Sequence, residues 1–145
     1  MFKMTDDGID FSLEIRQYRT PSKDDKWDNW CKCDMRVKVG DYLDYSVLDD
    51  EFLMSCEVLS LLRELEKLLG GEITRNKSIG FIEPDLTFEM YPRSMIGRDE
   101  IDVWVELLIA LRRSDTNYNG AVLTLPLERG NIESLLEYLK GVINV

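Results

Sequence analysis

The strict alternation of residues 30–39 constrains the fold of this chain more than any other feature of its sequence. Apolar side chains at Cys31, Cys33, Met35, Val37 and Val39 are separated by Trp30, Lys32, Asp34, Arg36 and Lys38. Because successive side chains of a β-strand point to opposite faces, this pattern predicts a strand with one buried face and one wet face, which is typical of antiparallel sheets. Gly40-Asp41 is a turn signal, and apolar residues alternate again at positions 43, 45 and 47, so we predict a β-hairpin.

Helical periodicity occurs in two other places. Between residues 55 and 69, leucine and valine recur at spacings of three and four, which predicts an amphipathic helix capped by the Ser55 hydroxyl and ended by Gly70-Gly71. The same spacing predicts a second helix that starts near Asn131, with Asn131 as its cap.

The order of the predicted elements favours the α+β class. Alternation predicts further strands at residues 10–18, 86–90, 101–111 and 123–127, and a weak one within 72–82. Pro126 removes one ladder donor, so we place it at an edge or at a strand end. Strands interrupted by single helices predict an antiparallel sheet of about five to six strands with two α-helices packed on one face. A length of 145 residues predicts one domain, residues 1–145.

The charge of the chain limits its partners. With 28 acidic and 18 basic residues the formal net charge is -10, whereas nucleic acids and anionic membranes select clustered Lys and Arg. We therefore expect neither as a partner, and we expect any charged partner to be basic. An acidic balance also serves solubility alone.

The residues that usually carry catalysis are missing or are placed as core residues. The chain has no histidine, which removes most nucleophile and base arrangements. Cys31 and Cys33 lie on the apolar side of the predicted strand, and Cys56, at the start of the helix, is the more plausible reactive thiol. The three cysteines cannot complete a four-ligand zinc site, and no acidic segment matches a calcium loop. We expect no enzymatic activity, no metal and no cofactor.

The cysteine count and the hydropathy pattern indicate the compartment. Three cysteines are an odd set, and the first residues lack the basic start and apolar stretch of a secretory signal, so we expect a reducing cytoplasm. No apolar run approaches the roughly 20 residues that a membrane-spanning helix needs.

Aromatic side chains lie beside acidic ones around the predicted hairpin. Trp27, Trp30, Tyr42 and Tyr45 are close in sequence to several aspartates, and the loop before Trp27 is proline-containing and highly charged. Such a combination can form a protein interface, because aromatic residues bury large area at low entropic cost and acids select a basic partner. The alternative is that the tryptophans close a sheet edge beneath the loop.

Three segments together resemble the WapI-family immunity proteins, which are small bacterial antitoxin-like proteins. The first is Asp28-Asn29-Trp30 leading into Met35-Arg36-Val37-Lys38-Val39, the second is the helix at 55–69 with its Gly70-Gly71-Glu72 exit, and the third is Glu83-Pro84-Asp85-Leu86-Thr87-Phe88-Glu89. The resemblance covers most of the chain in the same order and ends with the strand at 122–127 and the helix after it. Cys31 and Cys33 depart from it, since ordinary apolar or β-branched residues are expected there.

The resemblance implies a small α+β fold without enzymatic activity that neutralises a cognate toxin domain by direct binding. Such toxins are commonly basic, which suits a chain of charge -10. It carries over no catalytic residues. On this hypothesis the expected contacts are Asp24, Asp25, Trp27 and Asp28.

Two other functions remain open from the sequence. One is a structural or regulatory interaction module without a toxin partner, and a neighbouring toxin gene would discriminate between the two. The other is a carboxylate-dependent hydrolase, which requires two acids roughly 5 to 10 Å apart in a cleft. No pattern in the sequence places two acids together in this way.

Overall fold

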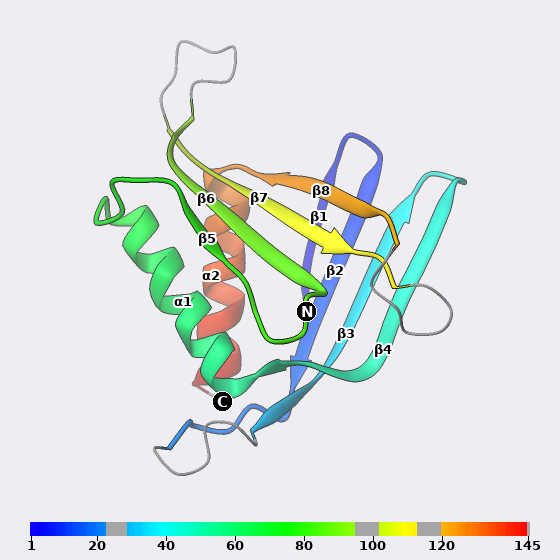
Figure 1. Ribbon diagram of the computed structural model, residues 1–145, viewed down its shortest axis with the longest axis horizontal. Coiled ribbons are helices and arrows are strands. Elements are labelled where there is room, and N and C mark those ends of the chain that lie inside the picture. Colours follow the sequence, from blue (N-terminus) through cyan, green and yellow to red (C-terminus); the bar gives the residue numbers. More distant parts are fainter. Residues whose placement is uncertain (23–28, 95–101, 113–119, 145) are drawn as a thin grey trace. The chain divides into compact units, whose positions relative to one another are not determined.

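The computed structural model describes residues 1–22, 29–94, 102–112 and 120–144, which form eight strands and two helices (Figure 1). In chain order these are β1 (Phe2–Asp6), β2 (Ile9–Arg16), β3 (Trp30–Val39), β4 (Leu43–Met54), α1 (Ser55–Leu69), β5 (Lys77–Ile79), β6 (Leu86–Ser94), β7 (Asp102–Ala110), β8 (Val122–Leu127) and α2 (Arg129–Ile143). The chain divides into two compact units. Unit 1 comprises Met1–Leu62 and Glu137–Val145, and unit 2 comprises Arg63–Leu136, so each helix contributes residues to both.

Unit 1 contains a four-stranded antiparallel meander in the order β1-β2-β3-β4, blue to cyan in Figure 1. The first hairpin is a two-residue turn in which Asp7 and Gly8 both have positive φ, at 46° and 81°. A turn of this form matches the right-handed twist of the two strands, and Asp-Gly is a favoured sequence for it. Strand β1 exists because this turn folds the short segment that starts at Phe2 back onto β2.

The predicted hairpin of β3 and β4 is confirmed. Its register pairs Val39 with Leu43, and the Tyr42 amide donates to the Val39 carbonyl at 2.9 Å. Gly40 has a φ of 50°, a conformation that glycine adopts without the steric penalty of a side chain. The register shifts between Cys31 and Met35, where β4 carries a bulge next to Asp49, whose φ is 51°.

The buried face of unit 1 follows the alternation of its strands. Side chains of β2, β3 and β4 that point inward are almost fully buried, together with residues of the first half of α1 and the last part of α2. Members of this core are Phe11, Leu13, Cys31, Cys33, Met35, Val37, Phe52, Val58, Leu61 and Leu139. Each large apolar side chain buried in this way contributes roughly 1.5–3 kcal/mol relative to exposure.

Tyr138 of α2 completes the hydrogen bonding of β2. The pairing of β1 with β2 begins at Phe2 and Leu13, so the amide of Ile15 has no partner on β1. The Tyr138 hydroxyl accepts that amide at 2.7 Å. The end of α2 is thereby fixed against the end of β2 by a polar contact as well as by apolar packing.

Unit 2 contains the second antiparallel sheet, in the order β5-β6-β7-β8, green to orange in Figure 1. Its inward residues alternate as strictly as those of unit 1 and include Leu86, Phe88, Met90, Val105, Leu107, Ile109, Leu125 and Leu127. Pro126 lies one residue before the end of β8, which pairs with β7 alone in the described sheet. The predicted edge position of Pro126 is confirmed.

The same type of capping hydrogen bond occurs at the start of both helices, and it differs from the capping that the sequence predicted. The Glu57 carboxylate accepts the Met54 amide at 2.9 Å, and the Asn131 side-chain oxygen accepts the Glu128 amide at 3.0 Å. In each case the third helical residue reaches back to the residue before the helix, which is one half of a capping box. The prediction that Ser55 caps α1 through its hydroxyl was therefore wrong, and α2 begins at Arg129 instead of near Asn131.

The α+β class and the two helices are confirmed, whereas the prediction of one sheet with five to six strands was wrong. The described residues form two sheets of four strands each. Helix α1 separates β4 from β5 in the chain, and each sheet pairs only its own consecutive strands. Alternation identifies a strand and its buried face but not its neighbours. The single-domain expectation stays a prediction.

Candidate partner-binding surface

The predicted contact residues Asp24, Asp25, Trp27 and Asp28 lie outside the described residues, and hydrogen bonds hold the chain on both sides of them. The Arg19 amide donates to the Ser55 hydroxyl at 3.1 Å, and the Ser55 amide donates to the Asn29 carbonyl at 2.7 Å. Ser55 is fully buried, and its hydroxyl also lies 3.5 Å from the Cys31 sulfur. Ser55 therefore joins the two ends of the loop at the start of α1.

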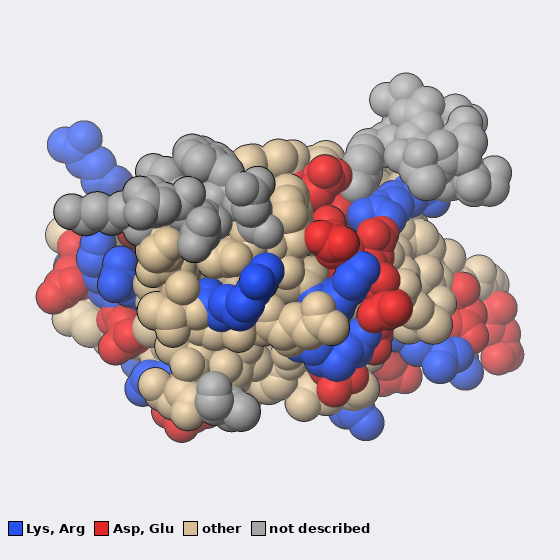
Figure 2. All heavy atoms as spheres, turned by 90° about the horizontal axis from the view of Figure 1, so that it is seen from below, with Lys and Arg blue, Asp and Glu red and all other residues tan. Residues whose placement is uncertain are grey.

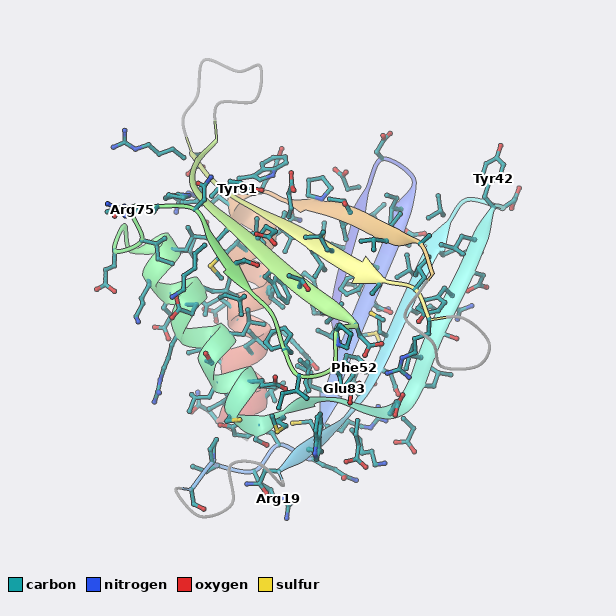
Figure 3. All side chains as sticks on the ribbon, viewed as in Figure 1. Arg19, Tyr42, Phe52, Arg75, Glu83 and Tyr91 are labelled. Carbon is teal, nitrogen blue, oxygen red and sulfur yellow. The ribbon has the colours of Figure 1, made fainter. Side chains whose placement is uncertain are left out.

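Of the aromatic residues beside acids, Tyr42 is the one presented to solvent in the described chain. Its side chain is 95% exposed at the β3–β4 turn and points away from the strands (Figure 3). Trp30 and Tyr45 are half-buried. Trp27 lies outside the described residues.

Most acidic side chains on the outward face of the unit 1 sheet already have basic partners. The Arg16 guanidinium donates to both oxygens of Asp34 and to Asp49, and the Asp49 amide donates to Asp34 at 2.6 Å. Beside this cluster, Arg36 donates to both oxygens of Asp44, and the Lys32 ammonium lies 3.1 Å from Glu51. Lys and Arg side chains are interspersed with Asp and Glu on the face that Figure 2 shows.

These pairs favour the ionised form of the carboxylates. Hydrogen bonds from Arg16 lower the pKa of Asp34, and hydrogen bonds from Arg36 lower the pKa of Asp44. The arginines in turn have raised pKa values, chiefly because of the same hydrogen bonds. Because arginine and lysine side chains of the same surface balance these carboxylates, the surface attracts a basic partner less than its number of acidic residues suggests.

The outward face of the unit 2 sheet has a different arrangement. Glu89 on β6 and Glu106 on β7 are directly opposite each other, and Tyr91 and Trp104 form the next outward pair in the same register. All four side chains are half-buried. The alternation of residues 101–111 had placed Trp104 opposite the core face, but the pairing that brings these four residues together could not be read from single strands.

Asp85, within the Glu83-Pro84-Asp85 segment of the family resemblance, has a structural role. Its side chain is fully buried, and Arg112 donates to its two oxygens at 2.8 and 3.0 Å. The Asp85 carbonyl also accepts the Ala110 amide at 3.0 Å. Asp85 thus fixes the segment before β6 to the end of β7.

Cys31 and Cys33, which the alternation of residues 30–39 predicts to be buried, are core residues in the structure. Cys31 and Cys33 are fully buried, and burial raises the pKa of Cys33 to about 12 and also that of Cys31. A thiol with a raised pKa carries little thiolate near neutral pH, so neither is suited to nucleophilic attack. Cys56 is half-buried, and all three are free cysteines.

The part of the chain that the structure describes has neither a metal-binding cluster nor a membrane-spanning helix. No group of three or more His, Cys, Asp or Glu residues there is arranged to hold a metal ion. Neither described helix has the length and apolar character to cross a membrane.

The sequence pattern of the Immunity protein WapI-like family matches residues 1–145, the whole chain. The chain belongs to this family. No curated protein and no solved structure matches it. The family resemblance read from three segments is thereby confirmed over the full length.

Proposed function

We propose that this WapI-like immunity protein neutralises a cognate basic toxin by binding it directly, without catalysis. The observation that carries the proposal is the match of the whole chain to the immunity family. The net charge of -10 supports the basic character of the toxin, because opposite fields accelerate capture and suppress wrong partners. We place the encounter in the reducing cytoplasm, where three free cysteines persist as thiols.

The contacts that we propose remain those of the loop: Asp24, Asp25, Trp27 and Asp28. Two properties of the described chain support the choice. Most carboxylates on the outward face of the unit 1 sheet are already paired, which makes that face less attractive to a cationic surface. The loop ends at Arg19 and Asn29 are joined through Ser55, which anchors both ends of the proposed contact segment at the start of α1.

The function is tested by co-expression with the toxin-like product of the adjacent gene. The chain should restore growth and form a stoichiometric complex on gel filtration with a catalytically inactive form of that product. The inactive form separates binding from toxicity. If no neighbouring product binds or is neutralised, the toxin role fails and the chain is better regarded as a general interaction module.

The loop is tested by replacing Asp24, Asp25 and Asp28 together with Asn. We expect association with the toxin to slow by roughly tenfold or more at low salt and to become less sensitive to salt. The matched control replaces the exposed Glu66, Glu72 and Glu133 with Gln, which changes the net charge equally. An equal loss in both triple variants would mean that net charge alone matters, and an unchanged rate would remove the loop from the interface.

A further inference from the structure

A row of outward side chains crosses all four strands of the unit 2 sheet. Ser78 on β5 is opposite Glu89 on β6, Glu89 is opposite Glu106 on β7, and Glu106 is opposite Pro126 on β8. The Ser78 hydroxyl donates to Glu89 at 2.8 Å. Lys77, the neighbour of Ser78, points to the other face and reaches Glu64 of α1 at 2.7 Å, so α1 lies on the face opposite this row.

The two glutamates in this row form an uncompensated pair. Side chains directly opposite on antiparallel strands have Cβ atoms about 4.5–5.5 Å apart, and like charges in such positions destabilise the sheet. Within the described residues neither carboxylate is in an ion pair, and two arginines of the same unit have other partners. Arg112 pairs with Asp85, and Arg129 pairs with Asp102.

The adjacent outward row supplies aromatic surface beside these carboxylates. Tyr91, labelled on β6 in Figure 3, is opposite Trp104 on β7. The indole nitrogen of Trp104 is buried and has no hydrogen-bond acceptor among the described residues. Burial raises the pKa of the Tyr91 hydroxyl, and the charges of Glu106 and Glu89 raise it further, which places both carboxylates within electrostatic reach of the ring.

We propose that Glu89, Glu106, Tyr91 and Trp104 form a receptor for an arginine side chain of a basic partner protein. A guanidinium group carries five donors in one plane, so it can bridge two carboxylates while its face stacks on an aromatic ring. These four side chains are also half-buried, so water is partly excluded and each charge-assisted hydrogen bond is strengthened. Lysine, a compact point charge with strong hydration, fits this arrangement less well.

The arrangement explains why a like-charged pair is present at all. Two glutamates that face each other without a cation between them repel each other and reduce the stability of the free protein. A bound guanidinium would remove that repulsion, so the stability lost in the free state is recovered on binding. This inference rests on the proposed function for the identity of the partner, which would be the toxin.

The receptor is tested without the toxin by adding a hexa-arginine peptide to the ¹⁵N-labelled full chain. The Trp104 indole resonance, identified by its absence in Trp104→Phe, should shift in a saturable way together with the amides of residues 89–91 and 104–106. Glu106→Gln should weaken the binding of the peptide by roughly tenfold, because one charge-assisted hydrogen bond is lost. A hexa-lysine peptide should bind several-fold more weakly.

Matched variants separate this site from general acidity. Glu89→Gln with Glu106→Gln should abolish the indole shift, while Glu66→Gln with Glu133→Gln, which removes the same charge from exposed helix positions, should leave it unchanged. Unchanged amide spectra elsewhere would show that each variant is folded, and Glu106→Gln suffices if the double variant is not. Equal binding by both double variants, or by the two peptides, would overturn the proposal.

The result is distinguishable from the fate of the proposed function. If the adjacent toxin is neutralised equally well by wild type and by the Glu89→Gln and Glu106→Gln double variant, and hexa-arginine does not shift Trp104, the receptor fails and the immunity role stands. If hexa-arginine binds at this row and no neighbouring toxin is neutralised, the receptor stands and the immunity role fails.

Discussion

The outward faces of the two sheets differ in whether their acidic side chains are paired with basic ones. In unit 1, Arg16 connects Asp34 and Asp49, and most of the other outward acids also have basic partners. In unit 2, Glu89 and Glu106 oppose each other without a described cation between them. The net charge of the chain does not reveal this difference, because it depends on which residues the register places side by side.

The comparison separates acids that hold the fold from acids that are available to a partner. A carboxylate that already accepts hydrogen bonds from an arginine must lose them before it can bind another cation. Glu89 and Glu106 are in no ion pair among the described residues, and the hydrogen bond to Glu89 comes from the neutral Ser78 hydroxyl. The outward face of unit 2 is therefore better prepared to bind a basic group than the outward face of unit 1, although unit 1 carries more acidic side chains around its hairpin.

The largest expected effect tests whether the two units unfold separately. Leu13→Ala in unit 1 and Leu107→Ala in unit 2 each remove a side chain that is 1% exposed, and each should reduce the free energy of unfolding by about 2–5 kcal/mol. Because α1 and α2 contribute residues to both units, we predict that either variant shifts one common transition. The measurement is urea unfolding followed at backbone amides of both sheets.

Separate midpoints for the two sheets would contradict this prediction. In that case Leu13→Ala would move the amides of β1 to β4 alone, and the proposal of a single domain would fail. The wild-type chain in the same titration is the control, since its two sets of amides must report one midpoint.

The next effect contrasts a buried ion pair with an exposed one. Asp85→Asn leaves Arg112 facing a buried neutral amide, and we expect a loss of about 3 kcal/mol, at the lower end for a broken buried pair because the Arg112 side chain is 16% exposed. Asp44→Asn breaks the pair with Arg36, whose side chain is 60% exposed, and should change stability far less. Equal losses in thermal or chemical unfolding would show that burial does not govern these pairs.

Much of the local structure could be predicted from the sequence because it depends on local patterns. Alternation at residues 30–39 and the helical spacing at 55–69 identify β3 and α1, and Gly71 has the positive φ of 77° expected at the end of a helix. Strand β1 was missed although Asp7-Gly8 is a strong signal for a tight hairpin. Alternation predicted a strand at residues 86–90, yet β6 continues through Pro92 to Ser94.

Pairing between strands and the candidate surface could not be predicted in the same way. Trp104 was placed on the outward face correctly, but its position opposite Tyr91 depends on the register of β6 with β7. The role of Ser55 was mispredicted for a similar reason. Its hydroxyl accepts the amide of the distant Arg19, and the Glu57 carboxylate accepts the Met54 amide at the start of the helix. Each of these features depends on residues far apart in the sequence, which a single strand or helix pattern does not contain.

The smallest expected effect is that neutralising two different carboxylates changes the stability of the protein in opposite directions. Asp34→Asn removes the negative charge that faces Arg16 and one of the two oxygens that accept its hydrogen bonds, so it should destabilise the protein at neutral pH. Glu106→Gln removes a repulsion with Glu89, so it should stabilise the free protein by roughly a few tenths of a kcal/mol. Both variants remove one negative charge from an outward strand position, and thermal unfolding at pH 7 measures both.

The pH dependence identifies the cause of the first change. Since the pKa of Asp34 is lowered from its ordinary 3.8 by Arg16, its contribution to stability is present above that value and is lost as the pH falls through the lower folded pKa. The deficit of Asp34→Asn relative to wild type should therefore shrink as the pH falls below about 4. A deficit that persisted in acid would assign the loss to packing. Destabilisation by Glu106→Gln at pH 7 would mean that this glutamate supports the sheet, and the contrast between the two outward faces would then no longer hold.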